Sequence, residues 1–461
     1  GRAGTIGQTY ARSEAYSVES LRDYQRYHRG NVYGSGSGLG TCDGTHHGTS
    51  SGSVTRNTTV DIYGGTIYNN VYGGGAMATV GPPKIANPNF APENWSKCTV
   101  NIYGGTIGDP TVYDTYNYGG TIYGASRGDR GGDLAEGESI ENYATVLWTE
   151  VNIKPHTDRT KDAVIAGNVY GGGRGGEVKM DTKVNLTGSK ILHNAYGGGR
   201  GTTAIAANVN GNTTVELNKG VADNAKGCIV DKVFGCNDLN GTPKGHALVH
   251  VYATQNADKG TISDKDALPP AYSAEKSPDE GHIAFMTNLI RDVTKSGGLA
   301  SDASVITTAR STINGKTEDD LEEFEKTGIL NAAKAIDVEM NKKYDTYGYD
   351  VKAVYGGGDL AIYDPDDTED ETEVIIEGCS VTSIKQVYGG GNAAPVPATK
   401  VTVSSCYIID ELLGGGNGKD NYQIDGKWYE NPGANVGYTQ MSHYVTTAAS
   451  ESEYATYGKG D

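Results

Sequence analysis

One short phrase recurs along most of the chain: an aliphatic residue, usually an aromatic residue, and then glycine. The copies are Val32-Tyr33-Gly34, Val71-Tyr72-Gly73, Ile122-Tyr123-Gly124, Val169-Tyr170-Gly171, Ala195-Tyr196-Gly197, Val233-Phe234-Gly235, Val354-Tyr355-Gly356, Val387-Tyr388-Gly389 and Leu412-Leu413-Gly414. The closest copies place Tyr170 and Tyr196 26 residues apart, and Tyr388 and Leu413 25 residues apart. Such a period indicates stacked repeats, and it suits one coil of a β-helix better than the roughly 40-residue blade of a propeller.

A second pattern precedes the phrase. Residues 59–67 (Thr-Val-Asp-Ile-Tyr-Gly-Gly-Thr-Ile) are matched by residues 99–107 (Thr-Val-Asn-Ile-Tyr-Gly-Gly-Thr-Ile). Looser copies occur at residues 184–186, 215–217, 249–251, 374–376 and 401–403. Apolar, often β-branched residues two positions apart are typical of a half-buried strand. We therefore predict two short strands per repeat, and an all-β solenoid that forms a parallel, right-handed β-helix.

Composition agrees with a folded solenoid. The chain has 461 residues, 67 of them glycine, and a mean hydropathy of −0.49, values that would suggest disorder if the glycines were not periodic. The net charge is −18 and basic residues do not cluster, so we expect neither nucleic acid nor an anionic membrane as a partner. No apolar run approaches the roughly 18 residues of a membrane span.

The repeats are interrupted once by a long segment with helical signals. Ser277-Pro278-Asp279-Glu280 and Thr317 each offer a helix start, followed by apolar residues at helical spacing. The predicted organisation is an N-terminal cap at 1–30, β-helix coils at 31–252, a helical insertion lobe at 253–350, further coils at 351–417, and a C-terminal tail or the start of a further repeat at 418–461. We expect the chain to be a module of a larger protein.

The cysteines leave alternatives open. Cys379 and Cys406 occupy the same place in successive repeats. Stacked strands lie about 4.8 Å apart, which permits a disulfide. Two stacked free thiols fit the pattern equally well.

Stacking the repeats produces a column of aromatic residues. Its members are Tyr33, Tyr72, Tyr123, Tyr170, Tyr196, Phe234, Tyr355 and Tyr388. If exposed, the rings could hold the faces of sugars, with Tyr123, Tyr170 and Tyr196 as ligand-binding candidates. If they are interior or covered by loops, they contribute packing energy, which is the interpretation we favour.

A column of polar residues lies four positions beyond the aromatic column. It includes Arg127, Arg174, Arg200, Asp238, Asp359, Asn392 and Asn417. Stacked arginines repel one another unless anions neutralise them. The guanidinium groups of Arg127, Arg174 and Arg200 could bind carboxylates of an acidic glycan. Neutralisation by acidic loops such as residues 129–138 is the alternative that we favour.

The same column permits an enzymatic hypothesis. Two carboxylates of unequal pKa serve glycoside hydrolysis, and an adjacent arginine can serve lyase chemistry on uronic acids, which would assign Arg200, Asp238 and Asp359 to catalysis. The similarity to β-helix enzymes of the pectate-lyase-like group is architectural, since no catalytic motif of that group is present. A ladder of Asn and Asp that closes each coil by hydrogen bonds is favoured, so we expect a protein without catalytic residues.

One acidic run is a candidate for calcium. Asp364, Asp366 and Asp367 supply hard oxygen ligands, but the glycine of an EF-hand is missing, and a solvated loop is favoured. No other cofactor is expected.

The alternation of Val-Tyr-Gly-Gly-Gly with Ile-Tyr-Gly-Gly-Thr-Ile resembles the glycine-rich repeats of surface or adhesin-like proteins of Bacteroidota-type bacteria. The resemblance covers about residues 31–417 without the insertion. It implies an extracellular or cell-surface module, structural or adhesive, whose loops and lobe meet a glycan, a host or cell-surface protein, or a second copy. The alternative is a polysaccharide lyase or glycoside hydrolase that acts on acidic glycans along the Arg/Asp column.

Overall fold

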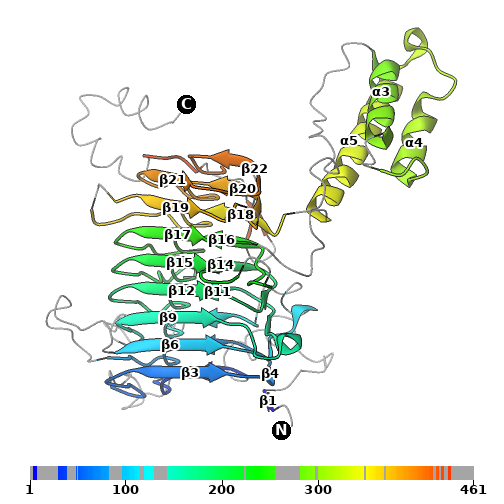
Figure 1. Ribbon diagram of the computed structural model, residues 1–461. Helices are drawn as coiled ribbons and strands as arrows, with labels where there is room; N and C mark the ends of the chain where they lie inside the picture. Colours follow the sequence, from blue (N-terminus) through cyan, green and yellow to red (C-terminus); the bar gives the residue numbers. More distant parts are fainter. Residues whose placement is uncertain are drawn as a thin grey trace, which may run out of the picture. The chain divides into compact units, whose positions relative to one another are not determined.

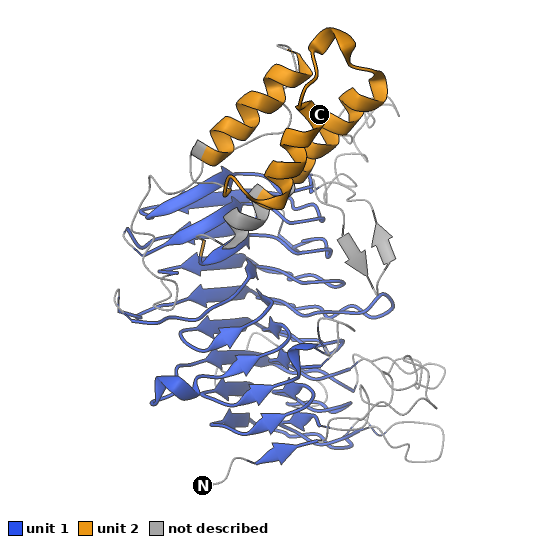
Figure 2. Ribbon diagram, turned by 90° about the vertical axis from the view of Figure 1, so that its right-hand side faces the viewer, with its two compact units in different colours: residues 1–257, 350–461 blue, residues 258–349 orange. Residues whose placement is uncertain are grey.

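The structure is a computed structural model that divides into two compact units, Gly1–Ala257 with Asp350–Asp461, and Asp258–Tyr349 (Figure 2). It describes residues 4–7, 30–38, 48, 50–81, 96–111, 113, 119–128, 143–222, 225–254, 281–295, 299–346, 349–367, 370–379, 381–418, 422–424, 427–429 and 434–437. Most of the predicted cap at 1–30, including a short helix expected at 17–27, lies outside these residues, as does most of the tail.

The first unit consists of three long sheets in which every strand pair is parallel (Figure 1). The eight-stranded sheet contains, in spatial order, β3 (Thr58–Ile62), β6 (Lys97–Ile102), β9 (Trp148–Ile153), β12 (Thr182–Leu186), β15 (Thr213–Leu217), β17 (Ala247–Val251), β19 (Thr372–Ile376) and β21 (Thr399–Val403). The nine-stranded sheet contains β2 (Val32–Tyr33), β5 (Val71–Tyr72), β8 (Ile122–Tyr123), β11 (Val169–Tyr170), β14 (Asn194–Tyr196), β16 (Lys232–Phe234), β18 (Val351–Tyr355), β20 (Ser383–Tyr388) and β22 (Ile408–Leu413). The predicted parallel stacking of repeats is confirmed.

A third sheet was not predicted. It contains β1 (Thr5–Ile6), β4 (Thr66–Ile67), β7 (Thr106–Ile107), β10 (Val164–Ile165) and β13 (Lys190–Ile191). These strands have two residues each, too few to show an alternating pattern of their own. Two further strands, β23 (Tyr422–Ile424) and β24 (Lys427–Tyr429), form an antiparallel pair.

The register aligns equivalent residues of successive repeats. Val71 pairs with Ile122 and Tyr72 with Tyr123, and the same relation holds up to Tyr388 and Leu413. The alternating apolar residues of the strands, such as Val151 and Ile153, are fully buried in one continuous core. In-register stacking of β-branched residues therefore builds the core of this unit.

Glycine follows the aromatic residue because the next strand is too close for a side chain. A Cβ atom placed on Gly356 would lie 2.2 Å from the carbonyl oxygen of Gly389. The carbonyl oxygen of Gly389 also accepts a hydrogen bond of 2.6 Å from the hydroxyl of Thr372. Thr149 and Thr182 make the equivalent bonds to Gly171 and Gly197.

The described part of the second unit contains three α-helices, α3 (His282–Lys295), α4 (Ser304–Ile313) and α5 (Glu323–Thr346), and one short 3-10 helix, Glu318–Asp320. Their apolar faces form a separate core that includes Met286, Ile306 and Ile329. The predicted start at 277–280 lies outside the described residues. Instead, the carboxylate of Glu318 accepts hydrogen bonds of 2.9 Å from the backbone N–H groups of His282 and Ile283 at the start of α3.

Among the described residues, no helix is both long and apolar enough to cross a membrane. Cys379 and Cys406 are both free thiols, as are Cys98, Cys228 and Cys236.

Candidate functional site

The aromatic column predicted from the sequence is present and buried. Rings from Tyr33 to Tyr388 stack with centroid distances of 4.6 to 5.0 Å and interplanar angles of 3° to 12°. Tyr72, Tyr170 and Phe234 have no exposed surface. The column lies on the opposite side of the nine-stranded sheet from the valine core, since Tyr and Val alternate along each strand. Rings that are covered in this way do not offer their faces to a sugar.

The tyrosine hydroxyls donate to the polar column. The hydroxyl of Tyr170 donates to the carboxylate of Asp238 over 2.6 Å, and that of Tyr196 donates to Asp359 over 3.2 Å. Burial, and then the charge of Asp238, raises the pKa of both tyrosines well above the usual value, so the hydroxyls keep their protons and remain donors. The two columns are therefore one hydrogen-bonded structure, which we call the Tyr/Arg/Asp ribbon.

The carboxylates of the ribbon are buried and influence each other. Burial, followed by the neighbouring charge of Asp359, raises the pKa of Asp238 to about 6, although Arg200 and the Tyr170 hydrogen bond oppose the shift. Burial likewise raises the pKa of Asp359. The carboxylate of Asp359 accepts a hydrogen bond of 2.7 Å from the amide of Asn392. The amide of Asn417 in turn donates to Asn392 over 2.8 Å. This end of the ribbon is therefore a ladder of Asn and Asp side chains, the arrangement that the sequence analysis favoured over a catalytic site.

The arginines of the ribbon lie inside the protein. Arg127 and Arg174 are 1% and 5% exposed, and Arg127 lies 3.5 Å from the hydroxyl of Tyr33. The Nε atom of Arg200 is 3.9 Å from the carboxylate of Asp238, and both side chains are about one-sixth exposed, at 17% and 16%. Although burial opposes it, the pKa of Arg200 is raised, because the neighbouring tyrosines and Asp238 favour its charge. The acidic loop at 129–138 lies outside the described residues.

The structure thus brings together Arg200, Asp238 and Asp359, the three residues of the enzymatic hypothesis, at one side of the column. Their polar atoms are directed to one another and to tyrosine hydroxyls. Such an arrangement stabilises a buried charged group, since each buried charge needs a partner. The small exposed fractions leave little room for a polysaccharide to reach these atoms.

Sequence reasoning missed the asparagine that precedes the phrase. The amide of Asn168 donates to the hydroxyl of Tyr170 over 2.9 Å, and Asn194 donates to Tyr196 over 3.1 Å. The backbone N–H of Asn194 donates to the side-chain oxygen of Asn168 over 2.9 Å, which links one coil to the next. The signal was present, because asparagine stands two positions before the tyrosine in several copies.

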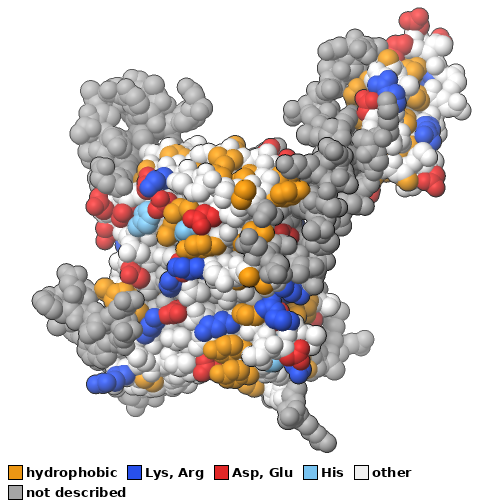
Figure 3. Space-filling view, in the orientation of Figure 1, with side chains coloured by type: hydrophobic (Ala, Val, Ile, Leu, Met, Phe, Trp, Pro, Cys, Tyr) orange, Lys and Arg blue, Asp and Glu red, His pale blue; other side chains and the backbone are white. Residues whose placement is uncertain are grey.

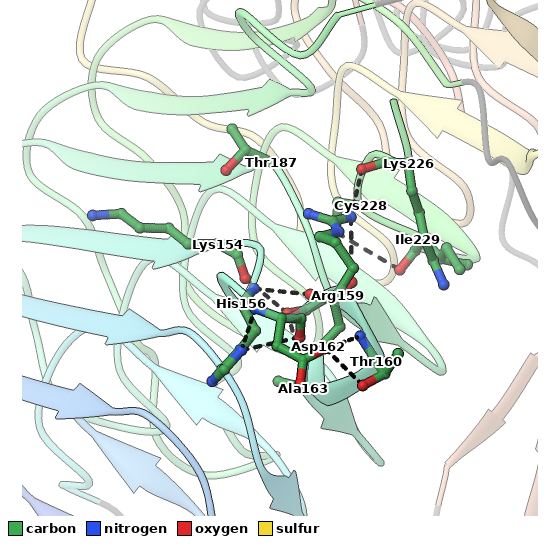
Figure 4. Close-up of polar contacts among 12 residues, drawn as sticks. Lys154, His156, Arg159, Thr160, Asp162, Ala163, Thr187, Lys226, Cys228 and Ile229 are labelled. Atoms are coloured by element: carbon green, nitrogen blue, oxygen red, sulfur yellow. Dashed lines mark hydrogen bonds and ion pairs between the residues drawn. The ribbon is translucent and has the colours of Figure 1, made fainter. Parts of the chain in front are cut away.

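A loop between β9 and β10 forms a second polar cluster (Figure 4). The guanidinium of Arg159 donates to the carbonyl oxygen of Lys226 over 2.6 Å and lies 3.2 Å from Asp162. The Nδ1 atom of His156 accepts a hydrogen bond of 2.8 Å from the backbone N–H of Asp158. In the neutral ring, this places the proton on Nε2.

Cys228 lies next to this loop, which brings a thiol, a histidine and a carboxylate into one region (Figure 4). Burial, assisted by the charge of Asp162, raises the pKa of Cys228 far above the usual range, so the thiol is not a nucleophile. We assign the cluster to the support of the loop.

The calcium candidates do not converge. Asp364 and Asp366 lie 3.5 and 3.6 Å from the ammonium of Lys244, so they form ion pairs with the same lysine. No group of three or more metal-ligating side chains occurs within the described part of the chain.

The outer side of the eight-stranded sheet carries an amide ladder. The amide of Asn101 donates to Asp61 over 2.8 Å, Asn152 donates to Asn101 over 3.0 Å, and Asn185 donates to Asn152 over 2.8 Å. We call these four residues the outer amide ladder. Unlike the ribbon, it ends at an exposed carboxylate.

No protein-family model, curated protein or solved structure matches the chain.

Proposed function

We propose that the chain is a structural and adhesive module of a surface or secreted protein, a right-handed parallel β-helix that binds a glycan on its exposed side. The glycine-rich phrase that it shares with surface repeats of Bacteroidota-type bacteria supports an extracellular location. The observation that carries the proposal is the burial of the Tyr/Arg/Asp ribbon, whose carboxylates Asp238 and Asp359 accept hydrogen bonds from the hydroxyls of Tyr170 and Tyr196. Binding is therefore left to the outer sheet face, the loops and the helical unit.

A catalytic role of the ribbon has one observation in its favour. A carboxyl group whose pKa is about 6, beside a second carboxylate, has the properties of a general acid. Against it, the carboxylate of Asp238 already accepts a short bond from Tyr170, and the group is 16% exposed. We therefore propose a binding protein and keep an enzyme for acidic glycans as the second candidate.

A glycan array with and without Ca²⁺, followed by a turnover assay on uronic-acid polymers, tests the two candidates. We expect binding to glycans that does not need Ca²⁺ and no new reducing ends or unsaturated products over hours. Turnover that disappears in Asp238→Asn, while the folded state is kept, would establish the enzyme instead. An array without any signal would contradict the adhesive role toward glycans.

A further inference from the structure

Tyr170 lies inside the aromatic column and is hydrogen-bonded to a carboxylate. Its ring is stacked between the rings of Tyr123 and Tyr196, with centroid distances of 5.0 and 4.8 Å. Its hydroxyl donates to Asp238 over 2.6 Å, a length typical of a charge-assisted hydrogen bond. The amide of Asn168 donates to the same hydroxyl oxygen over 2.9 Å. The strand of Tyr170, β11, has paired strands on both sides, so the site lies within the repeat array and not at its end.

Oxidation of this tyrosine requires a proton acceptor. Burial, and then the charge of Asp238, raises the pKa of Tyr170 well above its usual value, so the side chain is a neutral phenol. Removal of one electron from a phenol makes its O–H group strongly acidic, and a charged ring inside a protein is costly. The electron therefore leaves most easily when the proton leaves with it. The carboxylate of Asp238 is within reach for this transfer, because it already accepts the hydrogen bond.

Asp238 is suited to accept this proton and to return it. Burial, followed by the charge of Asp359, raises the pKa of Asp238 to about 6, while Arg200 and the hydrogen bond from Tyr170 act in the opposite direction. At pH 7 most Asp238 groups are therefore ionised and able to accept a proton, and protonation relieves the repulsion between the two carboxylates. When the ring is reduced again, the proton goes back, because the pKa of Tyr170 is far above that of Asp238.

The neighbouring rings can share the oxidation. The planes of Tyr123, Tyr170 and Tyr196 are inclined by only 6° and 12°, and the faces of parallel rings at these distances are in contact. Tyr196 also donates to a carboxylate, that of Asp359, over a longer distance of 3.2 Å. The next ring is Phe234, which has no phenolic proton to give. We therefore expect Tyr170 to be oxidised in preference to Tyr196, and the oxidation not to pass easily beyond Phe234.

The site is close to solvent although the ring of Tyr170 is fully buried. Asp238 accepts the hydrogen bond of the hydroxyl and is itself 16% exposed, and the adjacent Arg200 is 17% exposed. A single layer of side chains thus separates the hydroxyl from the solvent. Electrons can cross such a layer, so the oxidant does not have to touch the ring.

The oxidant that suits this molecule is small and cationic. The net charge of −18 attracts cations. Figure 3 shows hydrophobic, basic and acidic side chains interspersed over the described surface in that view, where no single apolar patch dominates. This face therefore does not favour a protein partner that docks through apolar contacts, whereas a small metal complex needs no docking area.

We propose that Tyr170 and Asp238 form a redox site for a small one-electron oxidant. The oxidant takes one electron from the ring of Tyr170 and is itself reduced by one electron. At the same time the phenolic O–H bond breaks, and its proton forms a new O–H bond on the carboxylate of Asp238. The products are a neutral tyrosyl radical, a protonated carboxyl group and the reduced oxidant. This activity is independent of glycan binding.

The test generates tris(bipyridine)ruthenium(III) by a light flash in a solution of the full chain. The tyrosyl radical is followed by its absorption and by electron paramagnetic resonance. Radicals on exposed tyrosines disappear quickly because they couple with one another, so the persistent radical reports a buried ring. We expect a persistent radical in the wild type, a several-fold smaller one in Tyr170→Phe, and none in the double variant Tyr170→Phe/Tyr196→Phe.

The chain offers a matched control for this test. Tyr363 is also fully buried, but its hydroxyl donates over 2.9 Å to the backbone carbonyl oxygen of Gly245 and not to a carboxylate. Tyr363→Phe should leave the persistent radical unchanged. The variants of the stack should fold, since Phe234 already occupies the position that pairs with Tyr196.

Asp238→Asn tests the proton transfer. It keeps the shape of the side chain but removes the proton acceptor, so the persistent radical should form about tenfold more slowly or worse. In the wild type, formation should be slower in deuterated water and should accelerate as the pH rises through about 6, where Asp238 ionises. Both effects should be absent in Asp238→Asn, whereas a purely structural role of Asp238 would leave them in place.

Each other outcome contradicts a definite part of the proposal. A persistent radical of equal size in the wild type and in the double variant would overturn the site, as would the absence of a persistent radical in the wild type. An unchanged rate, pH profile and isotope effect in Asp238→Asn would overturn the role of the carboxylate as proton acceptor.

Discussion

Single side chains of the ribbon show how charge is held inside this protein. Asp238 is enclosed beside Asp359, and its carboxylate is compensated by the hydrogen bond from Tyr170 and by the charge of Arg200. Burying two carboxylates together costs free energy unless one of them takes up a proton. The stability of the ribbon should therefore depend on pH.

The direction of this dependence follows from the raised pKa. The pKa of Asp238 is about 6 in the folded protein against an ordinary value of 3.8, so the folded state binds the proton more tightly. Proton binding by Asp238 therefore stabilises the folded state fully below pH 3.8, and this stabilisation is lost as the pH rises through about 6. We expect Asp238→Asn to raise the free energy of unfolding at pH 7 by about 1–3 kcal/mol and to flatten its change between pH 4 and 7.

Chemical denaturation at several pH values measures this effect. Asp366→Asn, at a side chain that is 79% exposed, is the matched control and should leave the pH profile as it is. Equal profiles for wild type and Asp238→Asn, or a loss of stability at pH 7, would show that the ion pair with Arg200 outweighs the cost of burial.

The sequence predicted the ribbon's members but not its contacts. Period-two alternation placed the tyrosines and valines on opposite sides, and equal spacing placed Asp238 next to Asp359. The hydrogen bonds of Tyr170 and Tyr196 reach residues two coils further on, at 238 and 359. Such contacts depend on side-chain length and stacking distance, which no sequence pattern states. The outer amide ladder was missed because its strands were considered only for their apolar residues.

Individual strands and helices were predictable where their residues form a recurrent or alternating pattern. Five-residue strands such as β3 and β12 show alternation, whereas the two-residue strands of the third sheet do not. Helix α4 (Ser304–Ile313) was missed, since its first turn lacks acidic residues and its N-cap, Ala303, makes no side-chain capping bond. For helix α3, the local signal at 277–280 predicted a start just ahead of His282, whereas its capping by Glu318, which is distant in sequence, could not be predicted.

A glycine follows each strand of the nine-stranded sheet, and comparing this position in two repeats, Gly389 and Gly414, tests why glycine recurs there. A Cβ atom on Gly389 would lie 2.3 Å from the carbonyl oxygen of Gly414, whereas one on Gly414 would meet nothing within 4 Å. Gly389→Ala must push two coils apart, and overpacking of this kind costs about 1–3 kcal/mol. Gly414→Ala should be almost neutral. Thermal unfolding of the two variants measures the difference.

Neither glycine has a positive φ, so the contrast reports the approach of the next coil and not backbone strain. Similar melting temperatures for Gly389→Ala and Gly414→Ala would mean that the coils can separate without cost. That result would argue against close stacking as the reason for the recurrent glycine.

In the molecule as a whole, the helical unit interrupts a solenoid that is otherwise continuous. β17 precedes the insertion and pairs with both β15 and β19, while β18 follows it and pairs with both β16 and β20. The helical unit has its own apolar core. The coils of a solenoid are stabilised by contacts with neighbouring coils, and the helices by their own core. The two units should therefore unfold separately.

Excision of residues 258–349 tests this separation. Residues 252–257 and 350 would still link Val251 to Val351, whereas the repeat of β12 reaches the equivalent position, Leu192, through residues 187–191. The remaining link is therefore long enough to close the coil. We expect the shortened chain to keep the main thermal transition of the solenoid within a few degrees and to lose the helical signal in circular dichroism. If the β-sheet signal disappeared together with the helices, the insertion would be an integral support of the coils on either side of it, and the adhesive face could not be treated as independent of the lobe.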